Sequence, residues 1–220
     1  MYNKDEVKIM EEQSIRRIYL VRHAAPEVEQ GIYYGGGTDL PLSYDGTIRA
    51  RALGAKLGVN PTHIYTSTML RARQSAELMF PNRKETIKDA EGLQEIFMGE
   101  WELKRFDEVR DKWNETFEIP GREFADCSCP GGETFRQVQT RAVSALEKIL
   151  AETEGDVLIV MHGGTIWTLL CHYFDFNLNN VFYYPMQYCS VCELQSNPNG
   201  MRLVRFNWTP ELASTGSWTK

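Results

Sequence analysis

The sequence predicts an α/β fold, a three-layer sandwich in which helices flank a mostly parallel central sheet. Short apolar segments alternate with longer segments of helical period along most of the chain. One short segment, VLIVM at 157–161, is apolar throughout, which is typical of a strand covered on both faces. Parallel neighbours need long crossover connections, and the intervening helices would supply them.

The first half of the chain begins this alternation. The segment RIYLVR at 17–22 is predicted to be a buried strand. The segment 42–58 has the pattern of a helix, and Ser43 is the candidate N-cap. A second strand is expected at 62–67, THIYTS.

The middle of the chain is expected to add a second helix and a weaker strand. The helix is predicted at 67–80, where Ser67 can cap its start and Pro81 ends it. The third strand is expected near 85–88. A polar amphipathic stretch follows, within a region from about 103 to 130 that we expect to form a lid-like insertion over the pocket.

The last third repeats the pattern and then changes it. A long helix at 133–152 carries apolar residues with a 3.6-residue period. The buried strand at 157–161 leads through a glycine turn into another helix. Two final strands, at 188–195 and 201–206, are joined by SNPNG and are predicted to form a hairpin.

Composition limits the class of protein. The chain has 220 residues, of which 42% are hydrophobic, enough to fill one core. We expect a single domain over residues 1–220, with 1–15 as a flexible extension. The net charge of −6 argues against binding to nucleic acid or to an anionic membrane surface. No run approaches the ~20 apolar residues of a membrane helix, and the charged N-terminus lacks a signal-peptide core, so a cytoplasmic location is expected.

The cysteines are expected to be reduced thiols. Their number is odd, and a chain of this length can bury a core without disulfides. The two close pairs are poorly spaced for zinc, even with His172 as a further ligand. One pair is CxC, and the other lies in an expected strand, where positions three apart point to opposite faces. We therefore expect no metal ion. The five are Cys127, Cys129, Cys171, Cys189 and Cys192.

Unusual residues follow three of the predicted strands. Arg22 and His23 follow the first, the segment 67–71 with Arg71 follows the second, and His162-Gly163-Gly164 follows the strand at 157–161. Loops at the carboxyl ends of parallel strands converge, so two histidines and two arginines are expected to face one crevice. The remaining histidines, which we expect to be structural, are His63 and His172.

Such a cluster suits a phosphate group. Guanidinium groups match phosphate oxygens, and the start of the helix after Gly164 adds backbone N–H donors. A neutral histidine can attack phosphorus, and the leaving oxygen then needs a proton. A carboxylic acid facing the dianion can stay protonated, and Glu95 is the best candidate for this role. The chain has no DxD, paired carboxylates or HExxH, so a metal-dependent hydrolase is not favoured.

Four segments carry a resemblance to a known family. In order, they are LVRHA, YTSTMLRARQSA, GLQEIFMGEWE and VLIVMHGGTI. They resemble the motifs of the histidine phosphatase superfamily, which also contains the cofactor-dependent phosphoglycerate mutases. YGGGTDLPLSYDG and CPGGETF are similar to further segments of the family. The resemblance covers about residues 17 to 207 and implies a phosphoglycerate mutase-like fold with its pocket at the carboxyl ends of the strands.

The resemblance also implies roles for individual residues. His23 would be the phosphorylated nucleophile and Glu95 the proton donor. His162 would be catalytic and, with Arg22 and Arg71, would complete the phosphate pocket. The backbone of Gly163 would bind phosphate at the start of the helix. No cofactor is implied.

Two positions depart from the family pattern. Ala24 follows His23 where the family usually has glycine, and we expect activity to survive if the backbone there keeps a negative φ. In NWTPEL, Glu211 stands where most members have the histidine of an NDxxHL segment. We have no physical account of that change.

The remaining motifs favour a phosphatase. The segment LQEIFMGEWE lacks the ERHYG of the mutases, and the YxGxxDxPLS pattern is similar to α-ribazole phosphatase-like and broad-specificity members. We predict a metal-independent histidine acid-type phosphatase that hydrolyses a small-molecule phosphomonoester through phosphohistidine. The alternatives are a phosphoglycerate mutase and a regulatory protein that binds phosphate without turnover. Apolar surface on the C-terminal hairpin could support a homodimer.

Overall fold

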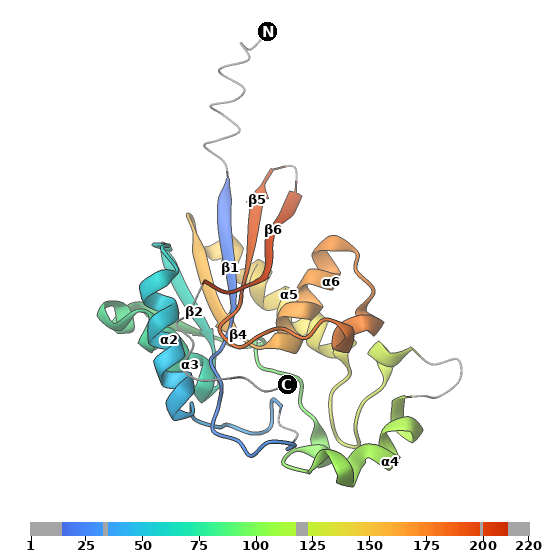
Figure 1. Cartoon of the computed structure of the whole chain (residues 1–220). Helices are drawn as coiled ribbons and strands as arrows, with labels where there is room; N and C mark the ends of the chain where they lie inside the picture. Colours follow the sequence, from blue (N-terminus) through green and yellow to red (C-terminus); the bar gives the residue numbers. More distant parts are fainter. Residues whose placement is uncertain (1–14, 33–34, 118–122, 199, 211–220) are drawn as a thin grey trace.

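The computed structural model describes residues 15–32, 35–117, 123–198 and 200–210 (Figure 1). Six strands form one sheet in the order β3-β2-β4-β1-β5-β6. The first four in this order are parallel, whereas β5 is antiparallel to β1 and β6 to β5. The predicted mostly parallel sheet is thus confirmed. The strands are β1 (Arg16–Arg22), β2 (His63–Ser67), β3 (Ile87–Ala90), β4 (Val157–Met161), β5 (Val191–Asn197) and β6 (Gly200–Trp208).

Helices cover both faces of this sheet (Figure 1). Side chains alternate along β1, so Ile18 and Leu20 join the core beneath α5 and α6, whereas Tyr19 and Val21 join the core beneath α2 and α3. The three layers predicted from the sequence are therefore present. The helices are α2 (Tyr44–Lys56), α3 (Leu70–Met79), α4 (Phe106–Phe117), α5 (Phe135–Glu152) and α6 (Gly163–Phe174).

Two helices begin at side-chain caps. The Ser43 hydroxyl accepts a hydrogen bond from the backbone N–H of Gly46 at 3.0 Å, which confirms the predicted N-cap of α2. A capping box between Thr134 and Gln137 begins α5. Both caps satisfy backbone donors that the first turn of a helix cannot pair internally.

The predicted cap of the next helix is wrong. Ser67 ends β2, and α3 begins three residues later, after an N-cap residue, Met69, that makes no side-chain cap bond. The Ser67 side chain instead lies 2.9 Å from a ring nitrogen of His162. A serine that follows a strand therefore takes part in the candidate site rather than in helix initiation.

Two strand boundaries also differ from the predicted ones. The segment Pro81–Thr86 forms a 3₁₀-helix, which moves β3 to Ile87–Ala90 rather than 85–88. At the other end of the sheet, Cys189 has a φ of 61° and the Ser190 N–H bonds the Gln187 carbonyl at 3.1 Å. This turn delays β5 from the expected 188 until residue 191.

Helix α4 lies apart from the sheet, at the lower edge of the molecule in Figure 1. That edge holds the carboxyl ends of the parallel strands. Val109 of α4 is 3% exposed and anchors the helix to the core. The lid-like role of residues 103–130 stays a prediction, and most of the expected extension, residues 1–14, lies outside the described residues.

Within the described part of the chain, no helix has the length and apolar character needed to cross a bilayer.

Candidate active site

His23 lies directly after β1 and is 2% exposed. Its Nδ1 is 2.7 Å from the carbonyl oxygen of Ala24, so Nδ1 carries the proton that this carbonyl accepts. The lone pair of Nε2 therefore points away from the backbone. The His23 backbone N–H donates to the Met161 carbonyl at 2.9 Å, which ties the His23 backbone to the end of β4.

Arg71 lies beside His23 Nε2 and is fully buried at the start of α3. Its Nε–H donates a hydrogen bond to His23 Nε2 at 3.3 Å. Its two terminal nitrogens donate to the carbonyls of Thr38 and Gly35, at 2.9 and 3.1 Å. The glycine-rich loop thus holds the guanidinium in place against the histidine.

Glu102 in turn holds the glycine-rich loop. Its carboxylate accepts hydrogen bonds from the N–H groups of Gly35 and Gly37, at 2.9 and 3.0 Å, and from the Thr38 hydroxyl. The carboxylate therefore positions the backbone of the same loop whose carbonyls bond the terminal nitrogens of Arg71.

Arg22, the last residue of β1, lies on the other side of His23. One terminal nitrogen donates to the Met186 carbonyl, and the guanidinium carbon lies 3.9 Å from the centre of the Tyr188 ring. The Tyr188 ring is also 5.6 Å from the His23 ring. The Arg22 Nε is buried and has no hydrogen-bond partner in the protein. A donor in this state is suited to a bound anion.

His162 is the N-cap residue of α6 and is fully buried. Its ring lies 5.0 Å from that of His23, at an interplanar angle of 61°. The Ser67 hydroxyl accepts a bond from the Met69 N–H at 3.3 Å, so its own proton is available to His162 Nε2. The single ring proton of the neutral His162 then lies on Nδ1. It is buried without a partner in the protein and, like the Arg22 Nε, is a donor available to an anion.

The electrostatics keep both rings neutral. Burial and then the charges of Arg71 and Arg22 hold the pKa of His23 well below its usual value. Burial, the neighbouring His23 and the same arginines lower the pKa of His162. A neutral His23 retains the lone pair that nucleophilic attack requires.

The Glu95 side chain contacts the first turn of α6. Its carboxylate accepts hydrogen bonds from the N–H groups of Gly164 and Ile96, both at 3.0 Å. The approach is close enough that a Cβ on Gly164 would lie 2.6 Å from Glu95 Oε1. Arg141 anchors the Glu95 backbone by donating to its carbonyl at 3.0 Å, and it also bonds Glu133.

A cavity of about 240 Å³ lies beside Arg22 and Glu95. Arg22 and Glu95 are its charged lining residues among those described, and Gly163 and Gly164 form its base at the start of α6. A Cβ on Gly163 would lie 3.3 Å from the Arg22 Nε, so this glycine and the arginine are neighbours. The other lining residues are apolar or aromatic: Ile96, Met98, Phe135, Val181, Tyr184, Pro185 and Met186.

The structure thus brings together the residues expected to form one crevice. His23 contacts Arg71 and faces His162, while Arg22 and Glu95 meet at the start of α6. Sequence reasoning placed Ser67 at this edge but gave it a capping role, and it missed Tyr188. Ser67 stood within the recognised segment after β2, whereas Tyr188 was hidden in a stretch predicted to be strand.

The position after the histidine accepts alanine. Ala24 is fully buried, and its N–H donates to the Ser75 hydroxyl at 2.9 Å. The φ of Ala24 is not positive, so the condition that the sequence set for this residue is met. The other departure, Glu211, lies outside the described residues.

The site suits an anion better than a metal ion, because arginine guanidinium groups and N–H donors surround it. Elsewhere in the described residues, no three side chains of His, Cys, Asp or Glu are grouped so that they could hold a metal. All five cysteines are buried and free. Burial raises the pKa of Cys129 to about 12, which keeps this thiol protonated.

Residues 18–209 match the family model of the histidine phosphatase superfamily, branch 1. The chain belongs to this superfamily.

Relatives within the histidine phosphatase superfamily carry different names. "Putative phosphoserine phosphatase 2" of Hydrogenobacter thermophilus is 27% identical over 194 residues, 88% of this chain and 96% of that protein. "Adenosylcobalamin/alpha-ribazole phosphatase" of Salmonella typhimurium is 25% identical and covers 70% of this chain and 77% of its own. Proteins described as probable phosphoglycerate mutases also match. The solved structure of Bacillus stearothermophilus YhfR superposes with a TM-score of 0.76 at 31% identity, over 86% of this chain and 95% of that one.

Proposed function

We propose that this chain is a metal-independent phosphomonoesterase that works through a phosphohistidine at His23. The observation that carries the proposal is the placement of the buried His23 ring, whose Nδ1 lies 2.7 Å from the Ala24 carbonyl while Nε2 lies 3.3 Å from the Arg71 Nε. The unpartnered donors Arg22 Nε and His162 Nδ1 mark where phosphate oxygens would bind. The phosphatase names among the relatives support the same reaction class.

In the first step, a phosphoryl oxygen of the bound substrate takes over the Arg71 Nε–H that donates to His23 Nε2. The freed Nε2 lone pair attacks phosphorus, and the bond from phosphorus to the ester oxygen breaks. The departing alkoxide takes a proton from Glu95, which must enter the reaction as the acid. Arg22, Arg71 and His162 donate hydrogen bonds to the phosphoryl oxygens as charge develops on them.

In the second step, water attacks the phosphohistidine while Glu95, now a carboxylate, accepts a proton from that water. The phosphorus–nitrogen bond breaks, and its electron pair returns to His23. Inorganic phosphate leaves and both catalytic groups regain their starting state.

The substrate is proposed to be a small molecule. The cavity of about 240 Å³ beside Glu95 has room for the alcohol part of a compact phosphate ester. Its walls are mainly apolar. A cytoplasmic location and a homodimer formed through the C-terminal hairpin stay predictions, which cell fractionation and light scattering would check.

The first experiment measures hydrolysis of p-nitrophenyl phosphate in the presence of EDTA. We expect turnover in wild-type protein and none in His23→Ala, with His172→Ala as a matched control because His172 is an exposed histidine on the far end of α6. Rapid acid-free quenching should trap a phosphorylated histidine at position 23. Activity that requires added metal, or that persists without His23, would refute the proposal.

A mutase is the second candidate, because some relatives are named as phosphoglycerate mutases. Incubation with 3-phosphoglycerate and a bisphosphoglycerate primer separates the two reactions. Fast isomerisation with little free phosphate would favour the mutase. Binding of vanadate without any phosphohistidine from a panel of phosphoesters would favour a regulatory protein instead.

A further inference from the structure

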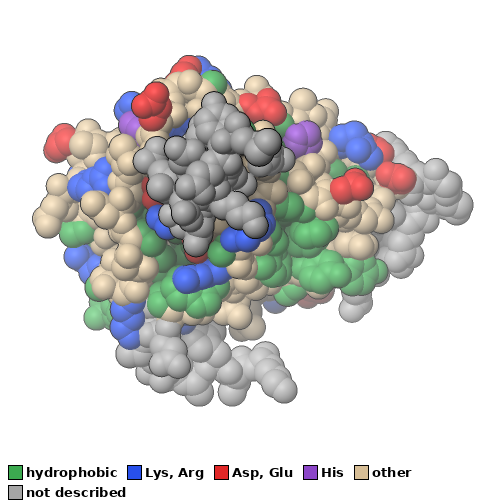
Figure 2. All heavy atoms as spheres, turned by 90° about the horizontal axis from the view of Figure 1, so that it is seen from above, with side chains coloured by type: hydrophobic (Ala, Val, Ile, Leu, Met, Phe, Trp, Pro, Cys, Tyr) green, Lys and Arg blue, Asp and Glu red, His purple; other side chains and the backbone are tan. Residues whose placement is uncertain are grey.

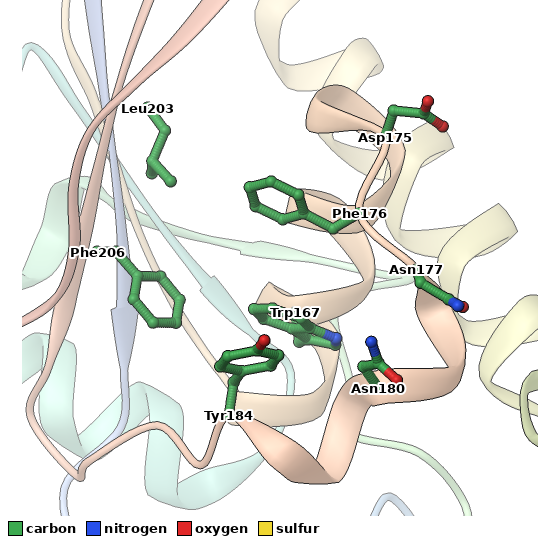
Figure 3. Close-up of a pocket in the computed structure, with 8 residues that line it drawn as sticks. All are labelled: Trp167, Asp175, Phe176, Asn177, Asn180, Tyr184, Leu203 and Phe206. Carbon is green, nitrogen blue, oxygen red and sulfur yellow. The ribbon is translucent and has the colours of Figure 1, made fainter.

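A second cavity, of about 520 Å³, lies between β6 and α6 (Figure 3). It is larger than the cavity beside Glu95 and has a different lining. We call it the aromatic slot and define it by the side chains Trp167, Phe176, Asn180, Tyr184, Leu203 and Phe206.

Two apolar walls face each other across the slot. Figure 3 shows Leu203 and Phe206 on the β6 side, opposite Phe176, Trp167 and Tyr184 on the side of α6 and the loop after it. Trp167 stacks with Tyr184 at 4.9 Å and with Phe176 at 6.0 Å, and it meets Phe206 edge to face at 5.9 Å. The slot is therefore bounded by aromatic rings, which suit a flat aromatic guest.

The outer rings of the slot remain partly in water. Phe176, Tyr184 and Phe206 are 41%, 49% and 39% exposed, whereas Trp167 is 5% exposed. Figure 2 shows hydrophobic side chains gathered in a broad band on the face seen from above. A guest that covers several of these side chains removes their apolar surface from water and gains affinity.

The polar end of the slot has a donor without an acceptor. Trp167 Nε1 is buried and makes no hydrogen bond in the protein, and Figure 3 shows this nitrogen directed toward Asn180. A small movement of the Asn180 amide would make room for a ligand acceptor beside the indole. That acceptor would then accept a hydrogen bond from the Trp167 Nε1–H. Asp175 is the charged residue among the described lining, and Figure 3 shows its carboxylate pointing away from the rings.

We propose that the aromatic slot is a second ligand-binding site for a flat, uncharged heteroaromatic molecule that carries a hydrogen-bond acceptor. The rings select a flat shape, the indole N–H selects an acceptor, and the lining offers no described cation to attract an anion. The size of the slot falls in the usual range for small-molecule sites, about 300 to 1,000 Å³.

The slot is also coupled to the phosphate cavity, a part of the inference that rests on the proposed function. Tyr184 lines both cavities. Two residues further along, the Met186 carbonyl accepts a hydrogen bond from Arg22. A guest that packs on Tyr184 therefore contacts the segment that positions a phosphate-binding arginine, and each ligand should change the affinity for the other by the same factor.

Binding is tested by calorimetric titration of the full-length protein with adenosine, a neutral heteroaromatic probe that lacks phosphate. We expect saturable binding, weakened about 3- to 10-fold in Phe206→Leu through the loss of ring contacts. Trp167→Phe should weaken it similarly, because the donor is lost. Tyr44→Leu, which removes an exposed aromatic ring on α2, should bind as wild type does. Benzoate, a flat anion, and cyclohexanecarboxamide, a saturated ring, should bind more weakly.

Coupling is tested by repeating the adenosine titration at increasing vanadate. The apparent affinity for adenosine should change by a limited factor and then level off. A loss that grows without limit would mean that adenosine binds in the phosphate cavity, which would overturn the proposal. His23→Ala should abolish turnover and keep adenosine binding, so failure of the proposed function is distinguishable from failure of the slot.

Two further results would overturn the second site. One is the absence of adenosine binding at millimolar concentration, or binding that Phe206→Leu and Trp167→Phe both leave unchanged. The other is a wild-type dimer in light scattering that Phe206→Leu converts to monomer, since a second copy of the chain would then be the occupant of this face.

Discussion

The Arg22 guanidinium carbon lies 3.9 Å from the centre of the Tyr188 ring, within the range of a cation–π contact. Such a contact orients the guanidinium while leaving its Nε available. If the site binds phosphate as proposed, Tyr188 is a positioning residue for that binding. We expect Tyr188→Ala to raise KM for p-nitrophenyl phosphate about 5- to 10-fold with a smaller change in kcat.

Tyr188→Phe provides the control for this prediction. It keeps the aromatic face over Arg22 and should retain most of the wild-type KM. Equal losses in the alanine and phenylalanine variants would contradict the role of the ring and would indicate that the hydroxyl matters instead.

Ser67 fixes the proton of His162. Ser67→Ala removes the hydroxyl that bonds His162 Nε2, so Nδ1 no longer carries a defined proton toward the anion. Because outer partners of this kind typically contribute 10-fold or more, we expect kcat to fall by about 10-fold.

Ser43→Ala is the matched control for Ser67→Ala. It removes the N-cap of α2 and should lower the free energy of unfolding by about 1 kcal/mol without changing kcat. A kcat that falls equally in both variants would mean that the effect of Ser67→Ala is general destabilisation.

Gly164 is required by the close approach of Glu95. A Cβ at this position would lie 2.6 Å from Glu95 Oε1, so Gly164→Ala should displace the carboxylate and lower kcat/KM by about 100-fold. Stability should change little, because alanine is favoured over glycine in a helix by roughly 0.5 to 1 kcal/mol. This gain offsets the cost of moving the Glu95 side chain. Thermal unfolding and steady-state kinetics separate the two effects.

Gly163→Ala should cost less activity than Gly164→Ala. The nearest atom to its added Cβ is the Arg22 Nε at 3.3 Å, a contact that a much smaller displacement relieves than the 2.6 Å contact at Gly164. The reverse order of the two variants would show that the displacement of Glu95 is not the cause of the loss.

Stability should decrease as the pH falls below about 6.5. The pKa values of His23 and His162 are lowered in the folded protein, so the unfolded chain binds more protons below its own histidine pKa. The free energy of unfolding should therefore fall by up to about 1.4 kcal/mol per pH unit for each histidine.

Urea denaturation at pH 7.5, 6.5 and 5.5 measures this slope. His162→Gln should reduce it by about one histidine's share, whereas Ser43→Ala, which removes no titratable group, should leave it unchanged. A slope that His162→Gln leaves at the wild-type value would show that the His162 ring does not stay neutral.

The sequence predicted the sheet and its layers because its buried strands are short, apolar and separated by helices of clear period. The strand VLIVM at 157–161 was placed to the residue, since it is apolar throughout and ends at a histidine followed by two glycines. The edges of the sheet were harder to place. The β5 boundary depends on Cys189 in a left-handed conformation, which side-chain pattern does not reveal.

The residues of the candidate site were named from the sequence because the carboxyl ends of parallel strands converge. Their supporting partners were not. The contact between Tyr188 and Arg22 joins residues 166 positions apart, counted as the difference between 188 and 22, and no local spacing signals it. Ser67 was recognised as a polar residue after a strand, but its local propensity to cap a helix masked its bond to His162.

The two unpartnered donors, Arg22 Nε and His162 Nδ1, have a consequence for handling the protein. Under the proposed function, they would bind inorganic phosphate as well as a substrate, so the reaction product would compete for the same donors. Kinetics measured in phosphate buffer would describe an inhibited enzyme. The same ion should raise the melting temperature, which makes phosphate a useful additive during purification and crystallisation and one to remove before any assay.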